Sequence, residues 1–212
     1  MTRVKICGLS EPATLDVAVA AGADYVGFVF HDRSPRNVSI DQARGLGERV
    51  PRRVGRVGVF VAPDDELVEQ AVALAGLDAV QVHGISDPAR LAALADRARR
   101  PLWRAVAVAT RADIDAAVAS PSQVDCLLFD AKAPIGSDLP GGNGVRFDWR
   151  LLAGCSLSRK WGLAGGLDPH SVADAVHATG APLVDVSSGV EDAPGVKSAD
   201  RIRAFIRAVR DL

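Results

Sequence analysis

Two residues, Cys7 and Asp130, carry side chains suited to moving protons, and each ends a short apolar run of the sequence. The runs are RVKIC at residues 3–7 and VDCLLFD at residues 124–130. One of them could act as a base and the other as an acid on a bound ligand. Two simpler interpretations stay open, because most free cysteines are packing residues and a lone Asp after a strand often caps a helix or a turn. Packing is the interpretation that fits Cys126 and Cys155.

Two glycine-containing segments predict an anion site. GLAGGLDPHSV at residues 162–172 includes Gly165 and Gly166, and DVSSGVE at residues 185–191 has the same arrangement. Glycine allows the backbone to approach an anion closely, and the start of a helix offers N–H donors and the positive end of its dipole. Each segment alone is weak evidence for such a site, since glycines also occur in tight turns. Together they indicate a phosphate site.

Other polar residues follow predicted strands. Arg36 lies in HDRSPRNVS at residues 31–39, and its guanidinium suits a carboxylate or a phosphate. Gln81 and His83 stand at a strand end, where lining a pocket and satisfying the core are equally good interpretations. The glycine- and proline-rich stretch at residues 132–144 has the character of a lid or binding loop.

The elements that must position these residues alternate between strands and amphipathic helices, which indicates βα units around a parallel sheet. The predicted strands are residues 3–7, 25–30, 56–61, 78–83, 102–108, 124–130, 159–165 and 182–188. The predicted helices are residues 12–21, 40–49, 64–74, 88–98, 112–119, 149–152, 169–177 and 199–209. Eight units in 212 residues leave roughly 26 residues each, close to a compact (β/α)8 barrel. An open sheet of eight strands is the alternative.

Strand alternation predicts which side chains face the inside of such a barrel. Lys5 and Cys7 would point inward from the first strand, and Asp185 inward from the eighth. Because the first and eighth strands are neighbours in a closed barrel and a buried lysine needs a partner, we expect Lys5 to contact Asp185. Two roles for the pair remain open: a structural ion pair, or a cation that lowers the pKa of Cys7.

Composition narrows the kind of partner. The formal net charge is −1 and no run of like charge occurs, so neither nucleic acid nor an acidic membrane surface is expected as a partner. The three cysteines are widely separated, which predicts neither a disulfide framework nor a zinc site. No signal peptide or membrane span is apparent. We expect one domain over residues 1–212, a reduced cytoplasmic protein and a small-molecule ligand.

A set of motifs running in order along the chain resembles the phosphoribosylanthranilate isomerase family of tryptophan biosynthesis. The motifs are KICG at 5–8, GFVF at 27–30, SPRNVS at 34–39, GVFV at 58–61, VQVHG at 80–84, LLFD at 127–130, GGNGVRFDW at 141–149, LAGGLDP at 163–169, DVSSGVE at 185–191 and PGVK at 194–197. Together they are specific, whereas of the single motifs only the first and the last are persuasive alone.

The resemblance implies a single (β/α)8 barrel that catalyses an Amadori rearrangement of a small phosphosugar, N-(5-phosphoribosyl)anthranilate, without a cofactor or a metal. By position, Cys7 would be the general base, Asp130 the general acid, and Arg36 the ligand of the anthranilate carboxylate. The remaining substrate-binding residues would be Gln81, His83, Gly142, Gly144, Gly165, Gly166, Asp185, Ser187, Ser188 and Gly189. The chain would be a monomer or a homodimer.

Two departures from the family pattern affect loops only. Asn143 stands where Thr or Ser is usual, and Ser198 stands where Asp often follows the PG-x-K motif. Two other functions remain alternatives. One is an isomerase that also, or instead, serves histidine biosynthesis, although those barrels are longer and have an aspartate at the position of Cys7. The other is a non-catalytic sensor of phosphate ligands, which would be expected to have a damaged acid–base pair.

Overall fold

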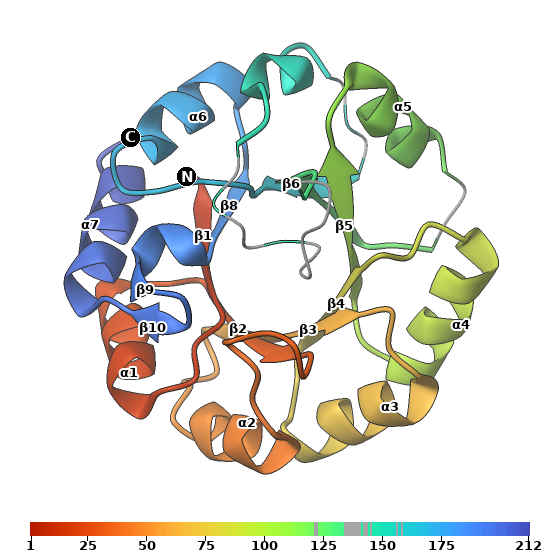
Figure 1. Ribbon diagram of the computed structural model, residues 1–212, viewed down its shortest axis with the longest axis vertical. Coiled ribbons are helices and arrows are strands. Elements are labelled where there is room, and N and C mark those ends of the chain that lie inside the picture. Colours follow the sequence, from red (N-terminus) through yellow and green to blue (C-terminus); the bar gives the residue numbers. More distant parts are fainter. Residues whose placement is uncertain (121–122, 134–140, 142–143, 145, 156, 158) are drawn as a thin grey trace.

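A closed barrel of eight parallel strands forms the centre of the protein (Figure 1). The structure is a computed structural model that describes residues 1–212 except 121–122, 134–140, 142–143, 145, 156 and 158. The strands are β1 (Arg3–Cys7), β2 (Tyr25–Phe30), β3 (Gly55–Val61), β4 (Ala79–His83), β5 (Leu102–Val108), β6 (Cys126–Ala131), β7 (Lys160–Leu163) and β8 (Leu183–Val186). This confirms the predicted barrel and rules out the open sheet.

The first and last strands pair with each other and close the barrel. β1 and β8 run parallel, with Lys5 opposite Asp185 in the register. Val4 and Ile6 are fully buried in the main apolar core, whereas Lys5 and Cys7 alternate with them and belong to the barrel interior. The facing predicted from strand alternation is therefore confirmed.

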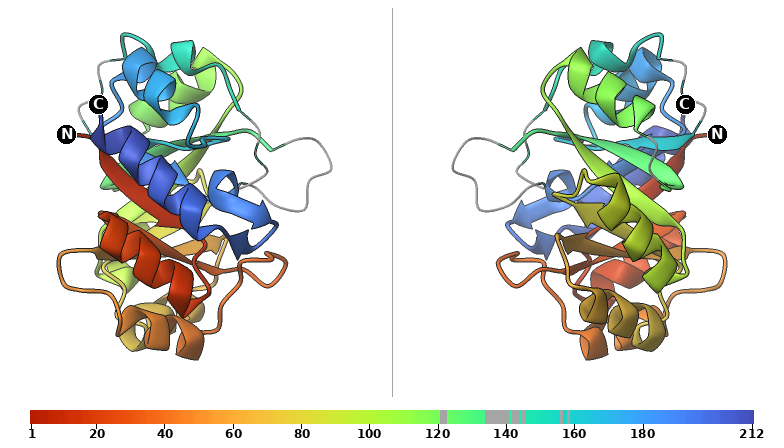
Figure 2. Two further views of the ribbon diagram at one scale, coloured as in Figure 1. Left: turned by 90° about the vertical axis from the view of Figure 1, so that its left-hand side faces the viewer. Right: turned by 90° about the vertical axis from the view of Figure 1, so that its right-hand side faces the viewer.

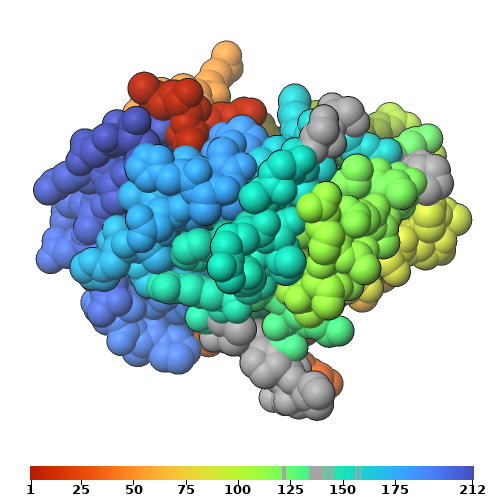
Figure 3. Space-filling view, turned by 90° about the horizontal axis from the view of Figure 1, so that it is seen from above, coloured from red at the N-terminus to blue at the C-terminus, as the bar shows by residue number. Residues whose placement is uncertain are grey.

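Helices surround the barrel on all sides. They are α1 (Pro12–Ala21), α2 (Ile40–Gly47), α3 (Asp65–Leu74), α4 (Pro88–Ala98), α5 (Arg111–Ala119), α6 (Val172–Thr179) and α7 (Ala199–Arg210). A single 3-10 turn, η1 (Trp149–Leu152), stands between α5 and α6 where a longer helix would complete the ring, and the three form a continuous wall (Figure 3). Asp64 and Asp87 cap α3 and α4 by accepting backbone N–H bonds.

Two local predictions were wrong or incomplete. Residues 169–171 form a turn instead of the first turn of α6, because Asp168 accepts hydrogen bonds from the backbone N–H groups of His170 and Ser171. After β8 the chain adds a 3-10 turn, η2 (Ser188–Val190), and an antiparallel hairpin of β9 (Glu191–Ala193) and β10 (Val196–Lys197) that the sequence analysis missed. Among the described residues, no helix has the length and apolar character needed to cross a membrane.

The two ends of the barrel differ in character. One end is filled by an apolar layer from the starts of the strands, in which Tyr25 packs edge-on against Trp103 and Cys126 is 3% exposed. Packing is thus the role of Cys126, as predicted. Figure 2 shows both termini near this end and the β9–β10 hairpin at the opposite one. The filled end leaves the carboxyl ends of the strands for a binding site.

Candidate active site

A pocket opens at the carboxyl ends of the strands, as expected for a barrel of this kind. Eleven of the predicted site residues line it: Cys7, Arg36, Gln81, His83, Asp130, Gly144, Gly165, Gly166, Asp185, Ser187 and Ser188. Gly142 lies outside the described residues. Gly189 does not line the pocket: a Cβ there would lie 1.8 Å from the Leu167 carbonyl oxygen, so this glycine lets the loops after β7 and β8 pack together.

The contact expected between Lys5 and Asp185 is confirmed. The Lys5 Nζ atom lies 3.0 Å from both carboxylate oxygens of Asp185, and Lys5 is fully buried. Burial alone would lower the pKa of Lys5, but the charges of Asp185 and Cys7 outweigh it, and the pKa is raised. The lysine is therefore a permanent cation beneath the pocket.

Cys7 is the last residue of β1 and lies next to this cation. A Cβ on the neighbouring Gly27 would come within 2.9 Å of the Cys7 Sγ and 3.2 Å of the Lys5 Nζ, so Gly27 makes room for both. Burial raises the pKa of the Cys7 thiol, Lys5 lowers it, and Asp185 raises it again, with a net rise. Lys5 therefore offsets the burial only in part, and Cys7 is a thiol at neutral pH.

Asp130 sits at the end of β6 with an environment that favours a proton. Burial, and then the charge of Asp185, raise the pKa of Asp130 to about 7, although its Oδ1 accepts a 2.8 Å bond from the Ala131 N–H. Added Cβ atoms on Gly141 and Gly165 would lie 2.7 and 3.0 Å from its carboxylate oxygens. Asp130 is thus enclosed by backbone and can hold a proton near neutral pH.

Gln81 and His83 point into the same pocket from β4 and contact each other. The Gln81 Nε2 lies 2.9 Å from the His83 Nε2, and burial, with the nearby positive charges, lowers the pKa of His83 to about 4. A neutral imidazole can accept this bond. The Gln81 Oε1 atom is buried and has no hydrogen-bond partner among the described residues.

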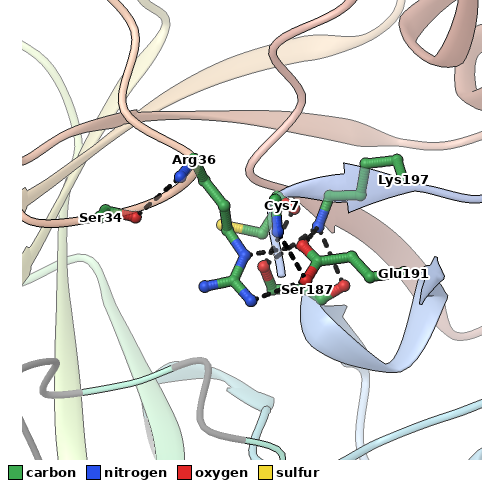
Figure 4. Close-up of polar contacts among 7 residues, drawn as sticks. Cys7, Ser34, Arg36, Ser187, Glu191 and Lys197 are labelled. Atoms are coloured by element: carbon green, nitrogen blue, oxygen red, sulfur yellow. Dashed lines mark hydrogen bonds and ion pairs between the residues drawn. The ribbon is translucent and has the colours of Figure 1, made fainter. Parts of the chain in front are cut away.

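Arg36 reaches the pocket from the β2–α2 loop and is bonded to Glu191, which is bonded in turn to Lys197 (Figure 4). Neither Glu191 nor Lys197 was among the predicted site residues. Its Nε and Nη2 atoms donate to the two carboxylate oxygens of Glu191 at 2.7 and 2.8 Å. Lys197 donates to the same carboxylate at 2.6 Å. Both new residues lie inside motifs that carried the family resemblance, DVSSGVE and PGVK, and that was the only signal for them.

The loops after β7 and β8, where the sequence predicts an anion site, both border the pocket. Gly165 and Gly166 line the pocket and have φ values of +84° and +63°, backbone conformations that favour glycine. The Ser188 hydroxyl borders the pocket from the second loop, at the start of η2. Among the described residues, no three His, Cys, Asp or Glu side chains gather as metal ligands would.

Comparison with known proteins gives a consistent result. The family model of N-(5'-phosphoribosyl)anthranilate (PRA) isomerase matches residues 4–208. The N-(5'-phosphoribosyl)anthranilate isomerase of Paracoccus denitrificans is 53% identical, over 96% of this chain and 94% of the relative. That of Paramagnetospirillum magneticum is 49% identical, over 98% and 96%.

Solved structures point to the same family as the sequence relatives. The crystal structure of phosphoribosyl anthranilate isomerase from Thermotoga maritima superposes with a TM-score of 0.87 at 35% identity, covering all of both chains. A phosphoribosyl anthranilate isomerase in complex with reduced 1-(o-carboxyphenylamino)-1-deoxyribulose 5-phosphate gives a TM-score of 0.85 at 34% identity, again over both whole chains. On sequence and fold together, this chain belongs to the N-(5'-phosphoribosyl)anthranilate isomerase family.

Proposed function

We propose that Cys7 and Asp130 are the base and acid with which this isomerase of tryptophan biosynthesis converts N-(5'-phosphoribosyl)anthranilate to 1-(2-carboxyphenylamino)-1-deoxyribulose 5-phosphate. The observation that carries the proposal is that both side chains line one pocket and that the pKa of Asp130 is raised to about 7. An acid with a pKa near the working pH is the most effective proton donor.

The first step opens the ribose ring. Asp130 gives its proton to the ring oxygen while the bond from that oxygen to the anomeric carbon breaks. The nitrogen lone pair forms a C=N bond, which leaves a protonated Schiff base. Because burial keeps Asp130 protonated to about pH 7, the proton is available where an ordinary aspartate would have lost it.

The second step removes a proton from the carbon next to the Schiff base. The Cys7 thiolate takes this proton, and the C–H electron pair forms a C=C bond while the C=N electrons return to nitrogen. The resulting enolamine tautomerises to the ketone. Only a minor fraction of Cys7 is thiolate in the resting enzyme, and the Lys5 cation raises that fraction.

The two ends of the substrate fit different parts of the pocket. The phosphate suits the backbone around Gly165 and Gly166 together with Ser188, since glycine-rich turns present N–H donors to anions. The anthranilate carboxylate suits Arg36. Gln81 Oε1, a buried acceptor, suits a sugar hydroxyl.

The assignment is tested with freshly generated phosphoribosylanthranilate and the variants Cys7→Ser and Asp130→Asn. Each should lose about 100- to 10,000-fold in kcat, while binding of the reduced product analogue is kept. Cys155→Ser is the matched control. Cys155 is a partly buried residue that packs against the apolar core next to η1, so this variant should keep full activity. Near wild-type turnover by Cys7→Ser would overturn the assignment. Turnover of the corresponding histidine-pathway aminoaldose would contradict the single activity.

Three further properties belong to the same proposal. We infer one barrel domain over residues 1–212 that acts on a small molecule and binds no nucleic acid, in line with the net charge of −1. Three cysteines without a disulfide fit the reducing cytoplasm. A dimeric phosphoribosylanthranilate isomerase is known from Thermotoga maritima, so monomer and homodimer are both compatible, and light scattering distinguishes them.

A further inference from the structure

The β9–β10 hairpin carries a buried carboxylate that is bonded to Arg36, a residue of the pocket lining, and a buried amine that is bonded to the same carboxylate (Figures 1 and 4). Glu191 and Lys197 are each 8% exposed, although they stand at the two ends of a short surface hairpin. Burying charged groups is costly unless they are paired and hydrogen-bonded. Their pairing therefore calls for an explanation beyond the hairpin itself.

Glu191 accepts four hydrogen bonds from other described residues. Its Oε1 accepts from the Arg36 Nε at 2.7 Å and from the Lys197 Nζ at 2.6 Å. Its Oε2 accepts from the Arg36 Nη2 at 2.8 Å and from the Gly195 N–H at 3.2 Å. This is a bidentate fork on one side of the guanidinium, the geometry that fixes an arginine in orientation as well as in place.

Backbone packing holds the same arginine loop in position. Gly195 has a φ of +83°, and a Cβ on it would lie 2.5 Å from the Pro35 carbonyl oxygen. A Cβ on Gly8 would lie 2.6 Å from the Arg36 Cδ. The β2–α2 loop is thus clamped between the turn of the hairpin and the end of β1.

Lys197 extends the network to the rest of the site. Its Nζ also donates to the Ser187 carbonyl oxygen at 2.9 Å and to the Ser187 Oγ at 3.2 Å. The Ser187 Oγ in turn donates to the Cys7 carbonyl oxygen at 3.2 Å. One chain of bonds therefore joins Arg36, the hairpin, the loop after β8 and the strand of Cys7.

We propose that Glu191 is a positioning residue, which together with Lys197 holds the Arg36 guanidinium at a fixed distance from the phosphate loop and from Cys7. This inference rests on the proposed role of Arg36 as the ligand of the substrate carboxylate. Glu191 also separates two buried cations, Arg36 and Lys197, which would otherwise repel each other.

Glu191→Gln tests the inference with almost no change in size. Both carboxylate oxygens accept two donors each, so either orientation of the amide places its NH2 group against two donors. The KM for phosphoribosylanthranilate should rise about 10- to 100-fold, the range expected for losing a hydrogen bond between charged groups, while kcat changes less. The inhibition constant of inorganic phosphate, which needs only the glycine loops, should stay unchanged.

Asp192→Asn is the matched control on the same hairpin. Asp192 forms an exposed pair with Arg201 at 3.3 Å and is far less buried, so its loss should leave KM and kcat unchanged. Circular dichroism checks that each variant is folded. If Glu191→Gln does not fold, Glu191→Asp keeps the charge, withdraws the carboxylate by one methylene, and should show the same rise in KM.

A double-mutant cycle separates positioning from general support of the fold. In an Arg36→Met background, Glu191→Gln should add no further rise in KM, because the group that Glu191 positions is gone. A full additional loss, or an unchanged KM in a folded Glu191→Gln protein, would overturn the inference while leaving the proposed function intact. An unchanged KM in Arg36→Met alone would instead overturn the role of Arg36, and this inference with it.

Discussion

Replacing Asp130 with asparagine should stabilise the protein while it lowers kcat by about 100- to 10,000-fold. The acid occupies a site that favours its neutral form, and asparagine is a neutral side chain of nearly the same shape. Its amide oxygen can keep the 2.8 Å bond from the Ala131 N–H, and no cavity is opened beside Gly141. The variant therefore removes a titration with little change in packing.

The size of the effect follows from the pKa of Asp130. In the unfolded chain the carboxyl titrates near 3.8, and in the folded protein burial, followed by the charge of Asp185, raises the pKa to about 7. Between these values the folded state holds the proton and the unfolded state does not, so the free energy of unfolding falls as pH rises. A pKa difference of roughly 3 between the two states means that about 4 kcal/mol of the free energy of unfolding is lost by pH 8. The free energy of unfolding of a whole domain is only about 5–15 kcal/mol, so this loss is a large share of the stability.

Urea unfolding at several pH values measures this directly. At pH 8 the free energy of unfolding of the Asp130→Asn protein should exceed that of wild type by about 4 kcal/mol. This corresponds to a urea midpoint roughly 2 M higher for a slope near 2 kcal/mol/M. At pH 4 the two proteins should be nearly equal. Asp96→Asn, at an exposed position of α4, is the control and should show no such difference between the two pH values. An equal gain at pH 4 and pH 8, or none at pH 8, would refute the reasoning.

Three further predictions concern activity. In the proposed mechanism the active form has a protonated Asp130 and an ionised Cys7. The value of kcat/KM should therefore rise about tenfold per pH unit up to about pH 7, stay level, and fall only above the raised pKa of Cys7. A steady-state pH series checks this profile. Asp185→Asn removes a charge that raises the pKa of both groups, so the break near pH 7 should move to lower pH in the same series. Gly141→Ala places a methyl group 2.7 Å from an Asp130 oxygen and should lower kcat/KM about tenfold or more, whereas Gly45→Ala, in open space on α2, should not.

The contact between Lys5 and Asp185 was predictable from sequence, whereas that between Arg36 and Glu191 was not. Strand alternation and barrel closure fix which side chains of neighbouring strands face each other, so the first pair follows from two periodic runs. Arg36 and Glu191 are 155 residues apart, and Arg36 lies on a loop. Loop side chains have no period that places them, so only the conformations of the β2–α2 loop and the β9–β10 hairpin bring them together.

The start of α6 shows the same limit at the level of the backbone. Asp168 followed by Pro169 is a typical helix start, which led to the predicted helix at residues 169–177. The Asp168 carboxylate instead bonds the N–H groups of two residues within a turn, and the helix begins at Val172. Side-chain caps and Asx turns use the same residues, and tertiary contacts such as the Arg146–Asp168 ion pair help to decide between them.

The charges around the pocket bear on both of the proposed proton transfers. Lys5 and Asp185 cancel, and Arg36 and Lys197 exceed Glu191 by one positive charge, so the resting site attracts a substrate with a phosphate and a carboxylate. In the proposed mechanism, bound anions raise the pKa of Asp130 and so favour its protonated form for ring opening. Ring opening creates the cationic Schiff base and an Asp130 carboxylate together, so these two charges offset each other. The Lys5 cation therefore remains the charge that favours the Cys7 thiolate at the second proton transfer.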